Sequence, residues 1–379
     1  MIVSSDERFC LYNTGEGDLL IFSKASGQLY AFDAFGVTLF SFLSEGGSKE
    51  TLLQTFEDND DVIAVIHTVS HLFEGREEIK HTTDMHILTL DYPSTSLHTT
   101  YTQPFHYRLG FFIFAIDTNN RLSIEEILVA FHHLACILKV DEKVALYIDF
   151  ITKDDRYTIR FNGKIIHEPL ELDALLPRVL DLIRIAYYKD NEYLISLHAG
   201  ALYFKKKLLL LPAVSGSGKS TLCAYLMHQG FEFLSDEVAM INKDSHICPI
   251  PLALAIKEGS WEALENNKIL FNDLRAHKRF DGQRLRYLAP ANYAKEDLKV
   301  EGAYLIFPRY IAREPTSIDS ITTLEALSLI ITAGYEVIDS YDEKSIREWI
   351  GIVETFQKYT ITYSDMDDAR QTIEKLMEE

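Results

Sequence analysis

Residues 213–220 have the sequence AVSGSGKS, which fits the phosphate-binding loop pattern A/G-x-x-x-x-G-K-S/T, with alanine in place of the more usual first glycine. The two glycines permit backbone conformations that other residues avoid, so successive N–H groups can point at phosphate oxygens. The lysine offers a positive charge to the β and γ phosphates, and the next hydroxyl suits Mg²⁺. We therefore predict that ATP is bound, with GTP left open, through Ser215, Gly216, Ser217, Gly218, Lys219, Ser220 and Thr221.

Two adjacent carboxylates, Asp236 and Glu237, follow this loop, the first of them 17 residues after Lys219 (236 − 219). The spacing leaves room for one helix of roughly ten residues, a stop at Gly230 and one strand. The carboxylates are then expected at a strand end beside the loop, where α/β sheets bind ligands. We predict that Asp236 accepts the proton of an attacking hydroxyl and that Ser220, Asp236 and Glu237 hold Mg²⁺. Alternatively, Asp236 is only a metal ligand and Glu237 is a solvated strand end.

The composition indicates a folded protein of two or three domains, since 379 residues with 47% hydrophobic content are ample for folded cores. The net charge of −20 repels nucleic-acid phosphates and anionic membranes, so we expect neither as a partner. The four cysteines are scattered without C-x-x-C spacing, which favours a reducing cytoplasm over disulfides or a thiolate zinc site. The longest apolar runs fall far short of the ~20 residues of a membrane span.

The elements that must position these residues follow from periodicity and turn signals. The fold class is α/β, or α+β overall, and we expect two domains, at residues 1–85 and 86–379, the second with subregions 86–190 and 191–379. For the first domain, the sequence pattern predicts a winged-helix-like βββααα unit. Its elements are expected at residues 8–12, 18–23, 28–32, 34–45, 48–57 and 61–74. For the second domain, the pattern predicts strands at 107–116, 144–151, 157–163 and 193–204, and helices at 124–138, 172–189 and 366–379.

Residues 197–238, LHAGALYFKKKLLLLPAVSGSGKSTLCAYLMHQGFEFLSDEV, resemble the core of HPr serine kinase/phosphorylase and its related kinases. The likeness continues through IKEGSWEAL, RYLAP, AYLIFPRY and YSDMDDARQTIEKL, and covers roughly residues 100–379. It implies a P-loop kinase domain with a mixed sheet, an oligomer, a base at Asp236, and a histidine, His198, near the nucleotide and the carboxylates. The alternative for His198 is a satisfied core histidine.

The chain departs from true HPr kinases because the C-terminal E-x-R-G-x-G signature is missing. We therefore do not expect HPr as the substrate, nor the reverse reaction with inorganic phosphate. Lys257, in the IKEGS block, and Arg309, in FPRY, are candidate phosphate or substrate contacts, with solvated side chains as the alternative. The basic segment HKRFDGQRLRY, residues 277–287, suits either an acidic or phosphorylated peptide or simple charge balance.

The N-terminal unit resembles PqqD-like domains, the recognition elements for precursor peptides, over DLLIFSKASGQLYAFDAFGVTLFSFLSEGGSKETLL. The resemblance implies that a leader peptide adds as a strand to the third strand, along Leu29, Tyr30, Ala31 and Phe32, and lies against one face of residues 62–73. The alternative is a unit that only packs on the kinase domain or mediates dimerisation.

Together these features predict a kinase that receives its substrate from an attached peptide-binding domain. The expected reaction is transfer of the γ-phosphate of ATP to a Ser or Thr hydroxyl of a ribosomally made precursor peptide. Two other functions remain open on the same residues. One is a kinase for a small-molecule hydroxyl, and the other is an ATP-gated peptide-binding scaffold that partners a maturation enzyme.

Overall fold

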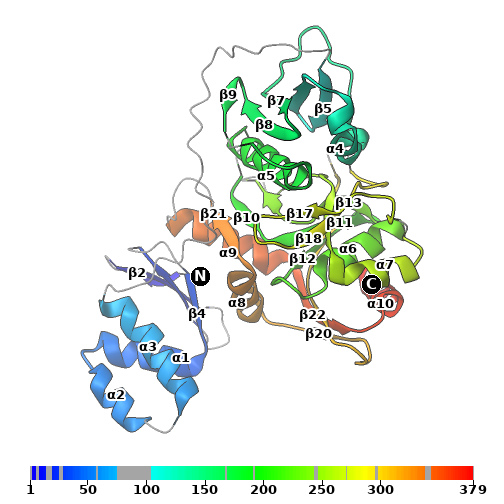
Figure 1. Cartoon of the computed structure of the whole chain (residues 1–379). Coiled ribbons are helices and arrows are strands. Elements are labelled where there is room, and N and C mark those ends of the chain that lie inside the picture. The colour runs from blue at the N-terminus through cyan, green and yellow to red at the C-terminus, as the bar shows by residue number, and fades with distance from the viewer. Residues whose placement is uncertain are drawn as a thin grey trace.

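The computed structural model describes residues 2–5, 8–13, 19–24, 29–56, 59–74, 104–166, 169–190, 193–242, 246–269, 271–294, 298–337 and 343–378. Over these ranges the chain forms a mixed α/β architecture (Figure 1) in which both parallel and antiparallel strand pairs occur. This confirms the expected mixed sheet. None of the helices within these ranges is long and apolar enough to span a membrane.

The N-terminal unit contains an antiparallel sheet with the order β1 (Ile2–Ser5), β2 (Phe9–Asn13), β3 (Leu19–Ser23) and β4 (Leu29–Phe32). Helices α1 (Ala34–Ser44), α2 (Lys49–Thr55) and α3 (Asp60–Glu74) follow. Asp33 caps α1 by accepting from Gly36 N–H at 2.8 Å, and Ser48 caps α2 by accepting from Thr51 N–H at 3.2 Å. The three strands and three helices are confirmed, whereas β1 was not predicted. The boundary at 85/86 lies outside the described residues.

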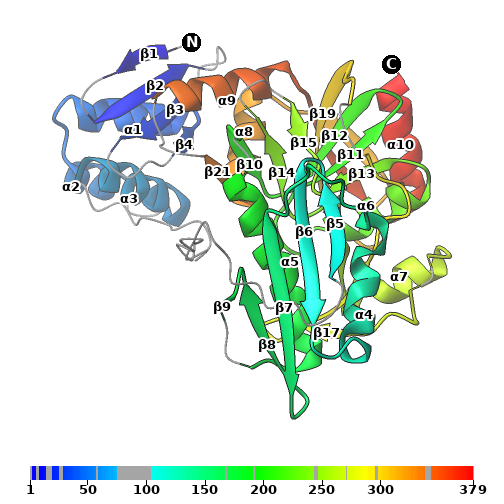
Figure 2. The ribbon, with the colours of Figure 1, turned by 90° about the horizontal axis from the view of Figure 1, so that it is seen from above.

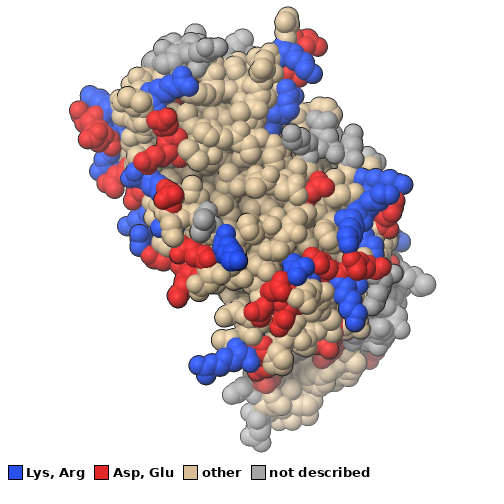
Figure 3. All heavy atoms as spheres, turned by 90° about the vertical axis from the view of Figure 1, so that its right-hand side faces the viewer, with Lys and Arg blue, Asp and Glu red and all other residues tan. Residues whose placement is uncertain are grey.

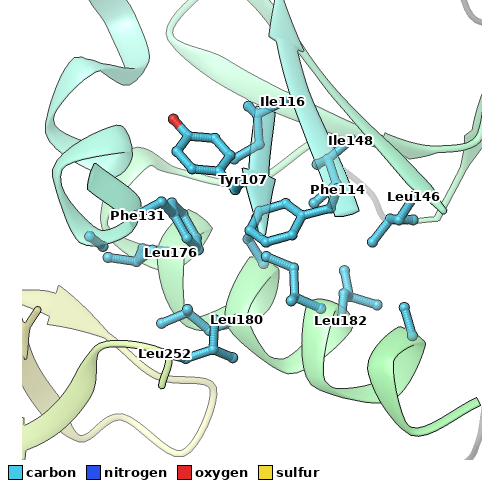
Figure 4. Packing of buried hydrophobic residues seen from close by; sticks show 14 of the residues in the cluster. Tyr107, Phe114, Ile116, Phe131, Leu146, Ile148, Leu176, Leu180, Leu182 and Leu252 are labelled. Carbon is cyan, nitrogen blue, oxygen red and sulfur yellow. The ribbon is translucent and has the colours of Figure 1, made fainter. Parts of the chain in front are cut away.

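A second unit consists of a five-stranded sheet covered by a long helix. The strands are β5 (Phe105–Leu109), β6 (Phe112–Thr118), β7 (Leu146–Lys153), β8 (Arg156–Phe161) and β9 (Lys164–Ile165), and the helix is α5 (Leu172–Asp190). Apolar side chains of this helix, such as Leu176 and Leu180, meet those of the sheet and Leu252 in one core (Figure 4). The expected helix with a proline in its first turns is confirmed.

Two sequence predictions in this unit were wrong. The single strand expected at residues 107–116 is a hairpin of β5 and β6, because Gly110 takes the left-handed conformation (φ 53°) and turns the chain. The helix expected at 124–138 is short and irregular. It consists of η1 (Leu122–Ile124), α4 (Glu125–Leu128) and η2 (Val129–Leu134), with 3₁₀ turns on both sides of one α-helical turn. Its buried residues nevertheless enter the same core as the sheet, namely Ile124, Ile127, Leu128, Ala130, Phe131 and Leu134.

The central sheet has six strands, in the order β13 (Glu232–Ser235), β11 (Ala199–Phe204), β12 (Lys207–Pro212), β19 (Gly302–Tyr310), β22 (Gln357–Tyr363) and β20 (Ser317–Ser320). Strands β12, β19 and β22 are parallel. Alternate side chains of these strands enter two separate cores, which places helices on both faces. One face carries α6 (Lys219–His228) and α10 (Met366–Glu378), and the other carries α8 (Thr323–Ala333) and α9 (Glu343–Thr355).

Two smaller sheets complete the part that surrounds the loop. One contains β15 (Ile247–Cys248), β14 (Ala239–Ile241), β10 (Ile195–Leu197) and β21 (Tyr335–Val337). The other contains β16 (Leu254–Lys257), β18 (Arg284–Leu288) and β17 (His277–Lys278), with η3 (Glu258–Ser260) and α7 (Trp261–Asn266) after β16. The single strand expected at 193–204 was therefore wrong. It breaks at His198, and its halves, β10 and β11, belong to different sheets.

The N-terminal sheet packs on both of its faces. One face, with Phe9, Ile21 and Phe32, contacts α1–α3. The other face contributes Cys10, Tyr12, Leu20, Phe22 and Leu29 to the same buried cluster as residues of α8 and α9, among them Leu327 and Trp349. Figures 1 and 2 both show α8 and α9 beside this sheet. The N-terminal unit is thus joined to the rest of the chain through a shared apolar core.

Candidate functional site

The phosphate-binding loop has the conformation that its sequence predicts. It connects β12, which ends at Pro212, to α6, which begins at Lys219. Gly216 (φ 92°) and Gly218 (φ 88°) are both left-handed, and Gly218 is the N-cap of α6. The loop is braced from outside, since its carbonyl oxygens at Ser217 and Gly218 accept from the Tyr310 N–H (3.1 Å) and the Tyr363 hydroxyl (3.3 Å).

The seven predicted phosphate-binding residues, 215–221, all line one cavity of about 550 Å³. Residues from distant parts of the chain complete its wall, namely His198, Glu237, Lys257, Arg279, Asn266, Asn267, Asp365 and Met366. The helix after the loop has the expected ten residues, and the chain turns at Gly230 (φ 101°) before β13 leads to the carboxylates. The predicted meeting of loop and carboxylates is therefore observed.

Lys219 and Asp236 form a buried ion pair at the base of this site. Their side chains are 8% and 3% exposed, and Lys219 Nζ lies 3.5 Å from Asp236 Oδ1. The same ammonium group donates to the backbone carbonyl of Asp236. Burial lowers the pKa of Lys219, but the charges of Asp236 and Glu237 outweigh it and the net pKa is raised. The lysine is therefore held in its charged form.

Asp236 itself does not reach the cavity wall. Neither of its carboxylate oxygens accepts a hydrogen bond of ordinary geometry, although both are buried. The Cys223 thiol lies beside it, and burial followed by this carboxylate's charge raises the thiol pKa. A buried carboxylate with unused oxygens next to a phosphate loop has the features of a ligand for a cation or its bound water.

Glu237, by contrast, faces the cavity together with His198. Glu237 Oε2 lies 3.6 Å from His198 Nε2, and each side chain is about one third exposed, at 32% and 36%. Burial raises the pKa of Glu237, but His198, Lys219 and Arg184 together hold it well below its usual range. The Glu237 carboxylate is thus ionised and open to a ligand, while that of Asp236 is enclosed.

His198 is fixed from behind by the end of α8. Its Nδ1 lies 3.0 Å from the carbonyl oxygen of Ala333, and its backbone N–H donates to Gly334 at 2.9 Å. The ring therefore lies between the Ala333 carbonyl oxygen and the Glu237 carboxylate. The break between β10 and β11 is what turns this side chain toward Glu237, and the expected grouping of His198 with the carboxylates is observed.

The two other basic candidates differ in position. Lys257 lines the cavity and donates to Ser215 Oγ at 2.6 Å, so it lies directly against the phosphate loop. Arg309 is exposed near the end of β19 and does not line the cavity. Its neighbour Tyr310 does, and it also stacks edge-on with Tyr363.

Sequence reasoning missed several residues of this wall. Arg279 belongs to the basic segment 277–287. Its charge suggested either an acidic partner or charge balance, but did not indicate which residue would line the cavity. Thr221 was assigned to phosphate alone, but its hydroxyl donates to Ser260 at 2.7 Å and so links α6 to η3. Asn266, at the end of α7, and Asp365, before α10, had no signal in the sequence, because they reach the cavity only through the packing of α7 and α10 around α6.

The residues around the loop fit a magnesium ion. Among the described residues, no cluster of three His, Cys, Asp or Glu side chains could hold a metal by itself. Mg²⁺ bound with a nucleotide does not need such a cluster, since it takes one or two protein oxygens together with phosphates and waters. Of the three residues expected to hold the ion, Ser220 and Glu237 line the cavity and offer oxygens directly, whereas Asp236 is enclosed beside Lys219 and would act through a water bound to the ion.

The predicted peptide-binding strand borders a second hollow. This groove, of about 950 Å³, is lined by Ala31, Phe32, Ala64, Val65 and Thr68 of the N-terminal unit and, on its other side, by the first two turns of α8. Strand β4 is the edge of its sheet, as strand addition requires. Leu29 is buried in the shared core and does not line the groove, and Tyr30 stacks on Phe32 with ring centroids 6.4 Å apart.

Charge is unevenly distributed on the face where α6, α7 and α10 lie. Acidic and basic side chains are interspersed around a broad area without charged residues (Figure 3).

In comparisons with known proteins, no family model matches the chain, and no curated protein matches it. The arguments for function therefore come from the geometry of the site.

Proposed function

We propose that this chain is an ATP-dependent kinase that phosphorylates a Ser or Thr hydroxyl of a ribosomally made precursor peptide. One observation carries the proposal. A phosphate loop with a charged lysine lines the same cavity as His198 and the ionised Glu237. A phosphoryl donor and an acceptor hydroxyl bound in this cavity would stand between the two.

In the proposed reaction the chain's residues bind and orient both substrates. The N–H groups of the loop, together with Lys219 and Lys257, hold the phosphates of ATP. The acceptor oxygen attacks the γ-phosphorus in line, the bond from this phosphorus to the ADP oxygen breaks, and the hydroxyl proton leaves to a carboxylate. Glu237 is our candidate for this carboxylate because it faces the cavity. The sequence prediction gave the role to Asp236, which stays the competing assignment.

A low pKa at Glu237 suits this role in a loose transition state. The carboxylate orients the hydroxyl throughout and receives the proton only late, when the bond to phosphorus is largely formed. His198 would keep the carboxylate in place. Ser220 and Asp236 would hold Mg²⁺, which when bound neutralises charge on the transferring phosphate.

The N-terminal unit would recruit the peptide through the groove between β4, α3 and α8. A leader segment added along the edge of β4 gains backbone hydrogen bonds, and the groove offers contacts to its side chains. Binding there raises the effective concentration of the acceptor hydroxyl near the cavity.

Mass spectrometry after incubation with Mg-ATP and a precursor peptide encoded beside the gene tests the proposal. We expect one added phosphate, lost in Glu237→Gln and retained in part by Asp236→Asn if Glu237 is the base. The reverse pattern would restore the base role to Asp236. No phosphate on the peptide with the wild-type chain, despite measurable binding of both substrates, would refute the kinase proposal.

Recruitment is tested with point variants, since removing residues 1–85 would uncover the shared core. The double variant Ala64→Arg/Thr68→Arg places two bulky charges in the groove from exposed positions of α3. His67→Arg on the same helix, exposed and outside the groove, is the matched control. We expect the groove variant alone to raise KM for the peptide at least tenfold.

A small-molecule kinase is the second candidate, and the shared core favours it. The N-terminal sheet already buries one face against α8 and α9, which gives this unit a structural role without any peptide. In that case the groove variant would leave the activity unchanged, and a small hydroxyl compound would accept the phosphate.

A further inference from the structure

The end of the β17–β18 hairpin brings one arginine of the basic segment into the catalytic cavity. Arg284 and Arg286 of this segment form ion pairs with Glu258 and Glu265 outside the cavity wall. Arg279 alone among the arginines of the segment lines the cavity in the described part of the chain. Arg279 is also paired, with Asp281, so what distinguishes it from Arg284 and Arg286 is its place in the cavity wall.

The guanidinium of Arg279 is held in a fixed orientation. Its Nε donates to Asp281 Oδ1 at 3.1 Å, and its Nη2 donates to Asp281 Oδ2 at 2.5 Å. Asp281 is itself fixed because it accepts from the Gln283 N–H at 3.1 Å in a turn that Gly282 (φ 81°) closes. Within the described ranges, Nη1 has no hydrogen-bond partner. A preorganised arginine thus keeps one edge available to an anion.

Arg279 differs from the two lysines of the cavity wall, because in the described part of the chain no hydrogen bond joins its side chain to the phosphate loop. The phosphate loop already has two ammonium groups, since Lys219 lies at its helix end and Lys257 is bonded to Ser215. Arg279 lines the same cavity as Glu237. The chain carries a net charge of −20, so a local cation in the cavity favours the approach of an acidic group.

We propose that Arg279 binds an acidic group of the acceptor and thereby selects a hydroxyl that has a carboxylate close to it in the substrate. This inference rests on the proposed kinase function and specifies its substrate class. Asp281 is a positioning residue that holds the guanidinium, and Glu237 and Arg279 together would hold the hydroxyl and the neighbouring acid.

The test uses two versions of the precursor peptide, with the residues on both sides of the acceptor hydroxyl replaced by Asp and Glu or by Asn and Gln. With wild-type protein and Mg-ATP, we expect kcat/KM to be about tenfold or more higher for the acidic version, as for a hydrogen bond to a charged group. Arg279→Gln should abolish this preference and leave the Kd of ATP unchanged. Asp281→Asn should weaken the preference. Arg275→Gln, which removes an exposed arginine paired with Glu126 away from the cavity, should keep it.

The failures can be told apart. Equal phosphorylation of both peptides by the wild type would overturn the inference and leave the kinase proposal standing. A weaker Kd for ATP in Arg279→Gln, with the acid preference intact, would reassign the arginine to the nucleotide phosphates. Absence of phosphate on every peptide would remove the kinase proposal and this inference with it.

Discussion

Replacing Lys219 with methionine tests the central electrostatic feature of the site. The variant removes the ammonium group that lies 3.5 Å from Asp236 and leaves that carboxylate buried, at 4% residue exposure, without its cationic partner. Unit charges at this distance attract by about 5 kcal/mol at an effective dielectric constant of about 20. Breaking a buried pair by removing one partner costs about 3–5 kcal/mol. We expect a loss of this size in the free energy of unfolding at pH 7.

The loss should depend on pH with a definite sign. A carboxyl group that is buried without a cation takes up a proton in a folded chain, and the same kind of group releases that proton near pH 4 in an unfolded chain. The folded state then binds more protons, so its stability relative to wild type falls as pH rises, by up to about 1.4 kcal/mol per unit. The deficit is therefore smaller at pH 5 than at pH 7.

Urea unfolding followed by far-UV circular dichroism at pH 5, 6 and 7 measures both quantities. The double variant Lys219→Met/Asp236→Asn should recover most of the loss, because the amide carries no charge. Lys257→Met is the control, because Lys257 lines the same cavity but donates to Ser215 in an exposed position. The free energy of unfolding of this variant should stay within about 0.5 kcal/mol of wild type. A Lys219→Met chain as stable as wild type, or a deficit independent of pH, would refute the buried-pair argument.

Three further predictions follow from the site. Gly218→Ala should weaken ATP binding at least tenfold in calorimetry while the fold persists, because φ is 88° and a Cβ would lie 2.5 Å from the Tyr363 hydroxyl oxygen. Gly200→Ala should cost about 1–3 kcal/mol in urea unfolding, because a Cβ there would lie 2.3 Å from Cys223 Sγ, and Cys223→Ala in the same chain should relieve the cost. The lowered pKa of Glu237 gives the wild type a stabilisation that is present above the ordinary glutamate pKa and is lost as pH falls below it. Glu237→Gln should therefore reduce the dependence of the free energy of unfolding on pH in this acidic range, as measured by urea unfolding.

The local parts of the site could be predicted from sequence because each depends on a short segment. The loop and the end of its helix at Gly230 follow from the positions of the glycines, and the helix itself follows from the spacing of apolar residues. Such features need no knowledge of the rest of the chain.

The parts that could not be predicted depend on packing between distant segments. Residues 193–204 have the composition of one strand, and nothing local indicates that His198 is where the chain passes from one sheet to another. Which of Asp236 and Glu237 lines the cavity is equally hidden in the sequence, because it depends on which carboxylate pairs with the loop lysine. Arg279 reaches the cavity only because β17 and β18 pair beside β16.

The core shared by the N-terminal sheet with α8 and α9 has a consequence for how the protein is made. Leu20, Phe22 and Leu29 are translated long before Leu327 and Trp349, which cover them and lie at least 298 residues (327 − 29) further along the chain. During translation the sheet can bury one face against α1–α3 at once, but its other face stays uncovered until α8 and α9 have been made. A nascent chain of this protein therefore carries an apolar sheet face over that whole interval, and ribosome-associated chaperones should bind it there.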